Sequence, residues 1–330
     1  MLPRTMQGIS RHRRFIYGMA ALMIMVFHMG TRFPNAGALK PLNLVQQLSG
    51  CGVEIFLLLS GTGLYRSLER NSEIPSFYAR RMRRILPPLA VCTLAFDIAL
   101  YCGPLRAAVG ENFVLQYLMS SAVWFVSFIA LMYLVYPLIF KLQKAHPGLI
   151  WPMAAGFAAL SFLLESEWRI SGEAMRMVSR IPIFLAGCAL AQRKRPLPRW
   201  LLPVMLPAAL AFTLCWRKKV LSCGYSLRML SYAACAVVLI MLFTGAAEWL
   251  SQGKIRRKIG LWIGFCGDYS LEIYLVFARV REAMLHIPAL QHAHVTTLQL
   301  DLAAAVLTIL LSALLGEACR RMFRSGRQSA

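Results

Sequence analysis

A single histidine, His28, lies within an apolar run of the sequence. Residues 15–30 contain no Asp, Glu, Lys or Arg, so His28 is the only side chain there that titrates near neutrality. An ionisable group is costly to place in hydrocarbon, so its presence in a membrane span indicates function. A neutral imidazole can remove a proton from a hydroxyl, which makes His28 a candidate general base. The alternative is a histidine that hydrogen-bonds to a neighbouring helix or reaches the membrane interface.

A carboxylate in the next apolar run is a candidate partner for that imidazole. Glu54 lies early in the run 48–66. Its depth is comparable to that of His28, because the two runs would cross the membrane in opposite directions. A carboxylate beside an imidazole orients the ring and raises its basicity, so we expect Glu54 to act with His28. The alternative is a glutamate at the membrane interface.

Arginines gather where the chain approaches its third apolar run. Arg80, Arg81 and Arg84 stand just before Pro87. Guanidinium groups clamp phosphates in a bidentate way, so the cluster can bind a polyphosphate, or else anionic lipid headgroups. The pair Ser60 and Gly61 ends the second run, where small residues allow either a phosphate contact or close helix packing.

Other polar and aromatic residues give weaker signals. Trp124 opens the fourth run and, by itself, is typical of an aromatic belt at the interface. His292 and His294 have the spacing of metal ligands, but no carboxylate or cysteine stands beside them, so we expect a solvated loop and no metal site. The nine cysteines form no C-x-x-C pair, which argues against a disulfide or zinc framework.

These residues must be positioned by membrane helices. The chain has 330 residues, of which 58% are hydrophobic and 15% charged, a composition typical of a multi-pass membrane protein. The net charge of +22 comes from short basic clusters between apolar runs, so we interpret it as topology and expect no nucleic-acid partner. We predict an all-α fold of about ten transmembrane helices, at 15–32, 48–66, 86–103, 119–141, 147–165, 178–192, 200–216, 228–249, 259–280 and 299–319.

The basic loops alternate along the chain and predict its orientation. With ten spans, almost all of them fall on one side, which the positive-inside rule assigns to the cytoplasm together with both termini. Residues 1–14 are then a cytoplasmic N-terminus and 320–330 a basic cytoplasmic tail. One loop disagrees, because Arg217, Lys218 and Lys219 fall outside. Either this loop has a task, such as holding an anionic acceptor, or the count near the seventh span is wrong. The first run is also similar to a signal peptide, but the runs that follow favour a retained span.

Several of these segments, in this order, resemble the acyltransferase-3 family of integral membrane acyltransferases. The resemblance covers nearly the whole chain, so residues 1–330 are expected to form a single acyltransferase-3-like membrane domain. The order of the segments is far more specific than any one of them. The similar segments are the first span with its histidine, 52–61, 80–87, 124–137, 180–187 and 267–275.

The resemblance implies transfer of an acyl group, usually acetyl, from acyl-CoA to a sugar hydroxyl of a cell-surface or exported glycan. It implies that His28 is catalytic, that Arg80, Arg81 and Arg84 face the phosphates of coenzyme A, and that Ser60 and Gly61 lie near them. Trp124 and Arg180 fall in segments that we assign to the substrate side. Acetyl-CoA is then a donor substrate, and no tightly bound cofactor is expected. The expected partners are acyl-CoA, a carbohydrate or glycan-lipid acceptor and the lipid bilayer of a bacterial plasma membrane.

The chain departs from the family pattern at three places. The family usually has an arginine eleven positions before its histidine, where this chain has Tyr17. Arg13 and Arg14 lie one turn earlier and are candidates to replace it at the donor site. A glutamate pair of many members corresponds here to Ile129 and Ala130, and a histidine of the ninth span corresponds to Phe277. The resemblance therefore predicts a membrane O-acyltransferase, and the alternatives are a transporter or flippase of an anionic or lipid-linked substrate, a non-catalytic component of a glycan assembly complex, or a catalytically altered family member.

Overall fold

Helices account for the regular structure of the computed structural model, which describes residues 6–33, 39–98, 124–168, 172–193, 196–198, 200–220, 223–287, 290 and 295–325. No strand occurs within these ranges, so the all-α prediction is confirmed for them. The α-helices are α1 (Met6–Arg11), α2 (Arg13–His28), α3 (Lys40–Leu48), α4 (Gly52–Arg70), α5 (Ile74–Cys92), α8 (Trp124–Ala145), α9 (Ile150–Ser166), α10 (Gly172–Val178), α11 (Ile181–Gln192), α12 (Leu201–Arg217), α13 (Gly224–Ser251), α14 (Lys254–Asp268), α15 (Ser270–Leu285) and α17 (Thr297–Ser325). A 3-10 turn, η1 (Ser49–Cys51), joins α3 to α4, and a π-helical turn, η2 (Thr93–Ile98), follows α5.

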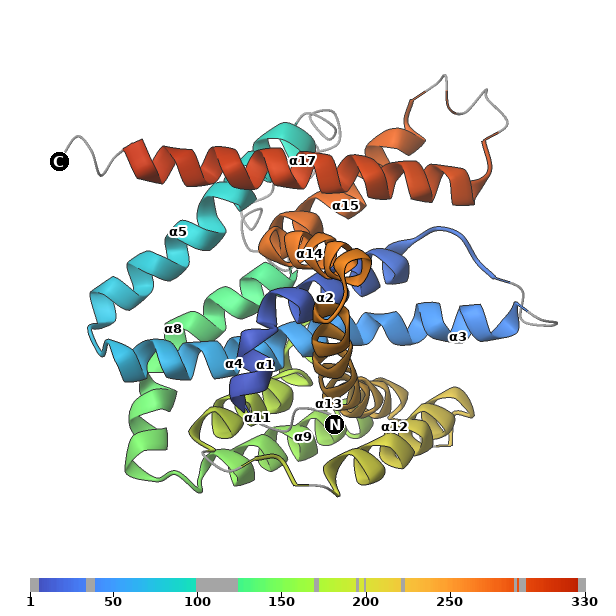
Figure 1. Ribbon diagram of the computed structural model, residues 1–330. Helices are drawn as coiled ribbons and strands as arrows, with labels where there is room; N and C mark the ends of the chain where they lie inside the picture. The colour runs from blue at the N-terminus through green and yellow to red at the C-terminus, as the bar shows by residue number, and fades with distance from the viewer. Residues whose placement is uncertain are drawn as a thin grey trace.

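Several helix ends lie in two groups at opposite sides of Figure 1. The ends of α2, α12 and α15 lie on the right of this view, with the starts of α3 and α17. The ends of α4, α8 and α17 and the start of α5 lie on the left. The C-terminal end of α2, where His28 stands, and the end of α12, which the 217–219 loop follows, therefore lie at the same end of the molecule.

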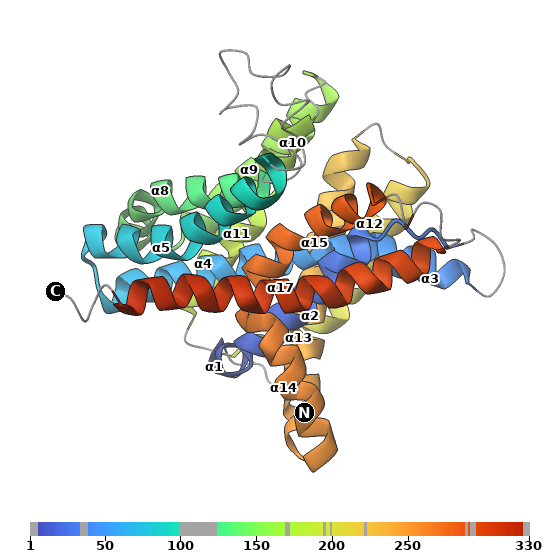
Figure 2. The same cartoon turned by 90° about the horizontal axis from the view of Figure 1, so that it is seen from above.

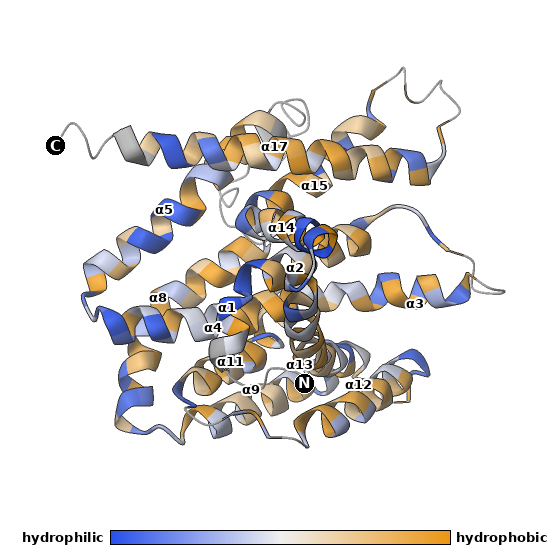
Figure 3. Ribbon diagram, in the orientation of Figure 1, coloured by the Kyte–Doolittle hydropathy of each residue, from blue (hydrophilic) through white to orange (hydrophobic). Residues whose placement is uncertain are grey.

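Fewer helices meet the length and composition of a membrane span than the ten predicted. Within the described residues five do so, and the bent pair α14–α15 adds a sixth if it is counted as one span. The apolar faces of these helices are visible as orange ribbon in Figure 3. Helix α2 has 16 residues and α9 and α12 have 17 each. Such helices are about 25 Å long, somewhat less than a hydrocarbon core of about 30 Å. The prediction for 86–103 lies partly outside the described residues. Ten spans and cytoplasmic termini therefore stay predictions.

The ninth predicted span is not one straight helix. The run 259–280 breaks between α14 and α15, whose axes differ by 77°. Figure 2 shows α14 crossing the direction of α17. Tyr269, at the break, has φ −112° and ψ 20°, so the helical hydrogen-bond pattern is interrupted there. The predicted span 259–280 therefore consists of two helices that together are long and apolar enough to cross a membrane, because apolar composition reports burial but not the direction of the helix axis.

Small residues bring α4 and α11 into close contact. A Cβ added at Gly61 would collide with the carbonyl oxygen of Phe184, and one added at Gly187 would collide with that of Leu58. The two glycines therefore allow backbone-to-backbone packing between α4 and α11, as small residues do in membrane bundles. Helix α4 in turn packs against α2 and α8.

Candidate active site

His28 is the last residue of α2, and its side chain is exposed there. The imidazole Nδ1 lies 2.9 Å from the carbonyl oxygen of Ile24, one turn earlier. A carbonyl oxygen only accepts hydrogen bonds, so Nδ1 carries the ring proton in the neutral side chain. The free lone pair is then on Nε2. The imidazole is therefore in the tautomer that a general base requires, and its orientation is set by its own helix.

The segment that follows His28 is held in place by side chains from distant helices. Asp301 of α17, fully buried, accepts hydrogen bonds from the backbone amides of Gly30 (3.2 Å) and Thr31 (2.8 Å). Arg281 of α15 pairs with the same carboxylate at 2.7 Å. On the other side, the amide group of the buried Gln46 donates to the carbonyl oxygens of Met29 (3.3 Å) and Thr31 (2.9 Å). The segment that follows α2 is therefore held through its backbone amides, which donate to Asp301, and through its carbonyl oxygens, which accept from Gln46.

Glu54 pairs with Arg180 in the interior. The carboxylate Oε1 lies 3.0 Å from Nε of Arg180, and the two side chains are 1% and 7% exposed. Arg180 also donates to the hydroxyl of Tyr225 at 3.1 Å. Among the contacts of the described residues, the imidazole of His28 therefore bonds to Ile24 and the carboxylate of Glu54 to Arg180. The structure does not bring Glu54 and His28 together as a hydrogen-bonded pair.

Trp124 is a buried ring beneath two arginines. The guanidinium of Arg180 lies 4.6 Å from the ring centroid, and that of Arg176 lies 5.5 Å from it. Only 7% of Trp124 is exposed, so the interpretation as a belt aromatic at the interface was wrong. A guanidinium over an indole gains a cation–π interaction, which lowers the cost of burying the charge of Arg180. Trp124, Arg180 and Glu54 thus form one buried stack.

At the other end of α2, Arg13 turns toward the interior. Its guanidinium donates to the hydroxyl of Tyr17 at 2.6 Å and to the carbonyl oxygen of Leu59 at 3.0 Å. Gly63 leaves the room that the guanidinium occupies, because a Cβ there would lie 2.5 Å from it. The ring of Tyr17 in turn stacks on Phe56, with centroids 5.2 Å apart. Arg13 therefore supplies a positive charge at the junction of α2 and α4.

Arg14 points the other way. Its guanidinium forms a two-point ion pair with Asp268 of α14, with Nε 2.7 Å from Oδ1, and 68% of its side chain is exposed. The two arginines that we expected at the donor site therefore differ. Arg13 faces inward, whereas Arg14 pairs with a carboxylate on the surface.

The three predicted arginines of α5 have different surroundings. Arg81 is partly buried between the rings of Phe77 and Tyr133, each 5.5 Å from its guanidinium. Arg84 forms a bidentate ion pair with the fully buried Glu272 of α15, one arm of which measures 3.0 Å. Arg80 is exposed and donates to the hydroxyl of Ser76 in its own helix.

Arg81 is therefore partly buried, and it has no carboxylate partner among the residues that the structure describes. The buried carboxylate of Glu272 offsets the charge of Arg84, so the three arginines differ in how available they are to a phosphate, and their contact with the donor stays a prediction. The idea of a phosphate contact at Gly61 is likewise displaced by helix packing, because Phe184 closes over that residue.

Ser60 shares a helix face with residues that contact α2. Positions 56, 60 and 63 are spaced by four and three residues, which places them on one side of α4. Phe56 stacks on Tyr17 and Gly63 borders Arg13. Ser60 itself is partly exposed, although the residues on either side of it are buried. The predicted Ser60 and Arg13 are thus brought to the same junction.

The chain therefore presents two polar centres at the two ends of one helix. His28 and Arg13 are separated by the length of α2, about 22 Å at 1.5 Å per residue. Sequence reasoning missed Asp301, Arg281 and Gln46 around the histidine. A carboxylate inside the last apolar run, at Asp301, was the available signal. His292 and His294 lie outside the described residues.

The comparison with protein families finds a match over nearly the whole chain. The sequence model of the acyltransferase-3 family, described as an acyltransferase domain, matches residues 16–317. The match includes every residue discussed above except Arg13 and Arg14. No curated protein and no solved structure matches the chain.

Proposed function

The chain belongs to the acyltransferase-3 family of membrane acyltransferases, and from this premise we propose that it transfers an acetyl group from acetyl-CoA to a sugar hydroxyl of a cell-surface or exported glycan. The site of action would be the plasma membrane of a bacterium. One observation carries the proposal. The Nδ1–H group of His28 donates a hydrogen bond to the carbonyl oxygen of Ile24, which leaves Nε2 free to act as a base at an exposed helix end.

His28 would act on the acceptor hydroxyl. Nε2 removes the hydroxyl proton as the oxygen attacks the thioester carbonyl carbon, and the C–S bond then breaks. The imidazolium returns the proton to the departing thiolate, so that free coenzyme A and an acetyl ester are formed. The acceptor hydroxyl needs access from the outer end of α2, and the exposure of His28 supports this.

The donor would approach from the opposite end of α2. Arg13 and Ser60 lie at this end, and Arg81 is within electrostatic range of Arg13. Neither arginine has a carboxylate partner among the described residues. A polyphosphate is the ligand class that such a pair of guanidinium groups recognises. The long flexible arm of coenzyme A connects its phosphates to its thioester, and it is suited to the length of α2 that separates Arg13 from His28. Arg80 and Arg84 would contribute at longer range.

The test is acetylation of surface glycan in cells that carry His28→Ala, with His286→Ala as the matched control. His286 is a histidine on the same side of the molecule whose side chain is 67% exposed. We expect His28→Ala to lower acetyl transfer by about 10²–10⁴-fold with normal membrane insertion, and His286→Ala to leave it unchanged. Glycan acetylation that survives in inserted His28→Ala protein would overturn the proposal.

The acceptor can be separated from the donor in a second assay. In this assay purified protein is mixed with acetyl-CoA alone. We expect the His28→Ala variant to bind acetyl-CoA as tightly as the native chain does, because the phosphates of the donor would lie about 22 Å from residue 28. Loss of donor binding in the His28→Ala variant would contradict the placement of the phosphates at the Arg13 end of α2. Movement of a glycan lipid across vesicles without acetyl transfer would support a flippase instead.

A further inference from the structure

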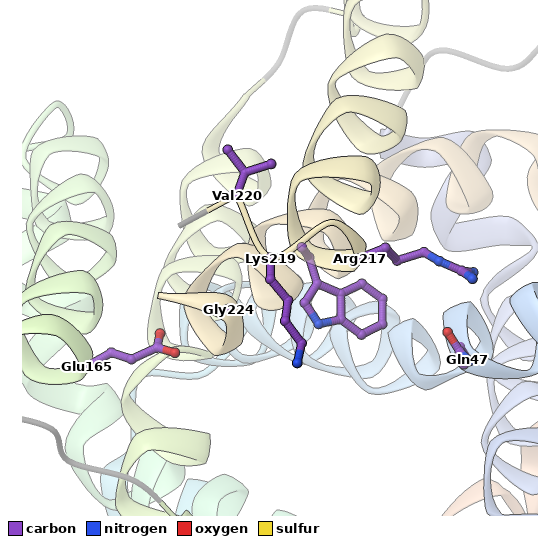
Figure 4. Close-up of a pocket in the computed structure, with 7 residues that line it drawn as sticks. Gln47, Glu165, Arg217, Lys219, Val220 and Gly224 are labelled. Carbon is purple, nitrogen blue, oxygen red and sulfur yellow. The ribbon is translucent and has the colours of Figure 1, made fainter. Parts of the chain in front are cut away.

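A cavity of about 660 Å³ lies where α12 turns into α13. It is lined by Gln47, Glu165, Trp216, Arg217, Lys219, Val220 and Gly224. Figure 4 shows side chains converging on it from α3, from the end of α9 and from the turn after α12. Its volume lies within the range of small-ligand sites, about 300–1,000 Å³. The mechanism above makes no use of it.

The cavity carries net positive charge. Arg217 and Lys219 are exposed, and neither forms an ion pair with any described residue. The carboxylate of Glu165 also faces the cavity, but both of its oxygens are occupied. They accept hydrogen bonds of 2.7 Å from the backbone amides of Tyr225 and Ser226, at the start of α13. Glu165 thus caps a helix, and two cations remain available to an anion.

Lys219 stands at a position that favours glycine. Its φ of 51° lies in the left-handed region. The backbone amides of Lys219 and Val220 close the end of α12 onto the carbonyl oxygens of Trp216 and Cys215, both at 3.1 Å. This hydrogen-bond pattern ends many helices, usually with glycine at the left-handed residue, because a Cβ is disfavoured there. A lysine that accepts this strain at the rim of a cavity points to a use for its side chain.

The wall of the cavity also includes an indole. Trp216 is half-buried, and Tyr232 of α13 packs edge-on against it at 6.3 Å. Arg228 lies 5.7 Å from the same ring. An indole held by its neighbours offers a flat apolar surface to the C–H face of a sugar ring. The amide of Gln47 adds a neutral hydrogen-bonding group at the other side of the cavity.

Helix α3 connects this cavity to the exit of α2. Gln46 bonds to the carbonyl oxygens of Met29 and Thr31, just after His28, while its neighbour Gln47 lines the cavity. The carbonyl oxygen of Gln47 accepts the hydroxyl of Tyr232 at 2.7 Å. The cavity and His28 therefore lie at the same end of the molecule and share a rigid support.

We propose that this cavity is a binding subsite for an anionic saccharide, in which Arg217 and Lys219 hold a carboxylate or phosphate of the sugar and Trp216 faces its ring. The proposal rests on the proposed function, since it makes the occupant a charged part of the acceptor glycan. It also explains the basic loop 217–219, the one cluster that disagrees with the predicted topology.

The experiment measures saccharide binding to the detergent-solubilised full chain, with no acyl donor present. The probes are a galacturonic acid tetrasaccharide (carboxylate), glucose 1-phosphate (phosphate) and neutral maltotetraose. Binding of either charged probe with Kd below that of maltotetraose, and weakened by added salt, is the expected result. Charged probes that bind no better than maltotetraose would overturn the proposal. The two charged arms distinguish a carboxylate from a phosphate.

The variants are Lys219→Asn and Arg217→Gln, with Lys218→Asn as the matched control. Asparagine tolerates the left-handed backbone, so Lys219→Asn preserves the turn. Lys218 belongs to the same loop and is exposed, but it does not line the cavity. We expect Kd for the bound charged probe to rise about ten-fold in Lys219→Asn and Arg217→Gln and to stay unchanged in Lys218→Asn.

An equal effect in all three variants would indicate long-range attraction only and would overturn the subsite. Because binding is read without acetyl transfer, a failure of the acyltransferase assignment would appear separately.

Discussion

The guanidinium of Arg13 donates a 2.6 Å hydrogen bond to the hydroxyl of Tyr17, one turn further along α2. Tyr17 occupies the position where the acyltransferase-3 pattern has an arginine. The guanidinium also lies 5.0 Å from the centroid of the Tyr17 ring and bonds to Leu59 of α4. Arg13 therefore places a positive charge one turn before Tyr17, on the face of α2 that meets α4, and the tyrosine hydroxyl supports it.

This relationship separates the roles of Arg13 and Arg14. We expect Arg13→Ala to weaken acetyl-CoA binding about ten-fold or more, because a charge-assisted contact contributes about 1.5–3 kcal/mol. Arg14→Ala is the matched control, since its guanidinium pairs with Asp268 on the surface, and its effect on binding should be within about two-fold. Isothermal titration of acetyl-CoA checks both. Equal Kd values for the two variants would contradict the assignment of the donor site to Arg13.

Asp301 is expected to position His28 from a distance. Asp301→Ala removes the acceptor of two backbone amides and leaves Arg281 without its partner, which should lower stability by about 2–4 kcal/mol. The more specific variant is Asp301→Asn, which keeps the shape of the side chain. It should lower kcat for acetyl transfer while KM for acetyl-CoA stays the same, because the donor end of α2 is undisturbed.

Thermal unfolding in detergent and steady-state kinetics separate these two effects of Asp301. A variant of Asp301 with reduced Tm but native kcat would mean that the residue serves stability alone. Arg281→Gln combined with Asp301→Asn should recover part of the lost stability, since no unpaired charge is left buried.

The Glu54–Arg180 pair is expected to be a stabilising element of the core. Glu54→Gln or Arg180→Gln alone leaves one charge buried without its partner and should cost about 3–5 kcal/mol. The double variant Glu54→Leu with Arg180→Met should be more stable than either single variant, because both charges are removed together. Thermal unfolding of the three proteins is the measurement. Single variants as stable as the native chain would show that neither charge is desolvated.

Gly61 is expected to serve helix packing rather than the donor. Gly61→Ala places a Cβ against the carbonyl of Phe184, so α4 and α11 must separate, with a loss of about 1–3 kcal/mol. Gly156→Ala is the matched control in α9, where no atom lies within 4 Å of an added Cβ. It should stabilise the helix by about 0.5–1 kcal/mol. A lower Tm in Gly61→Ala, with donor affinity unchanged in the protein that remains folded, is the expected outcome.

Much of the helical framework could be predicted from the sequence, because apolar runs mark the segments that are buried. The predicted runs 119–141, 178–192 and 299–319 correspond to α8, α11 and α17. The sequence did not show the break at Tyr269 within the predicted ninth span, since the run stays apolar on both sides of it. The length of α2 also differs from that of a full span, so an apolar run does not by itself determine how far a helix extends.

The candidate site was predicted less completely than the helices. The isolation of His28 in an apolar run and the basic cluster before Pro87 were visible in the residues themselves. The sequence could not rank Arg80, Arg81 and Arg84, because their difference lies in Glu272, which is 188 positions from Arg84. It also could not show that Glu54 pairs with Arg180 and that His28 bonds to Ile24.

The sequence by itself determined that this is a helical membrane protein with one imidazole near the end of its first apolar run. It did so because the hydrophobicity of a segment and the spacing of its residues along a helix are local properties, which do not depend on how the segments pack. The tertiary structure alone decided which charges are free and which are paired. Asp301 reaches Thr31 across 270 positions, and the choice between Arg13 and Arg14 depends on which face of α2 meets α4 and which meets α14. Such partners follow from the rotation and packing of whole helices, and buried charges are stable only where that packing supplies an opposite charge or a hydrogen bond.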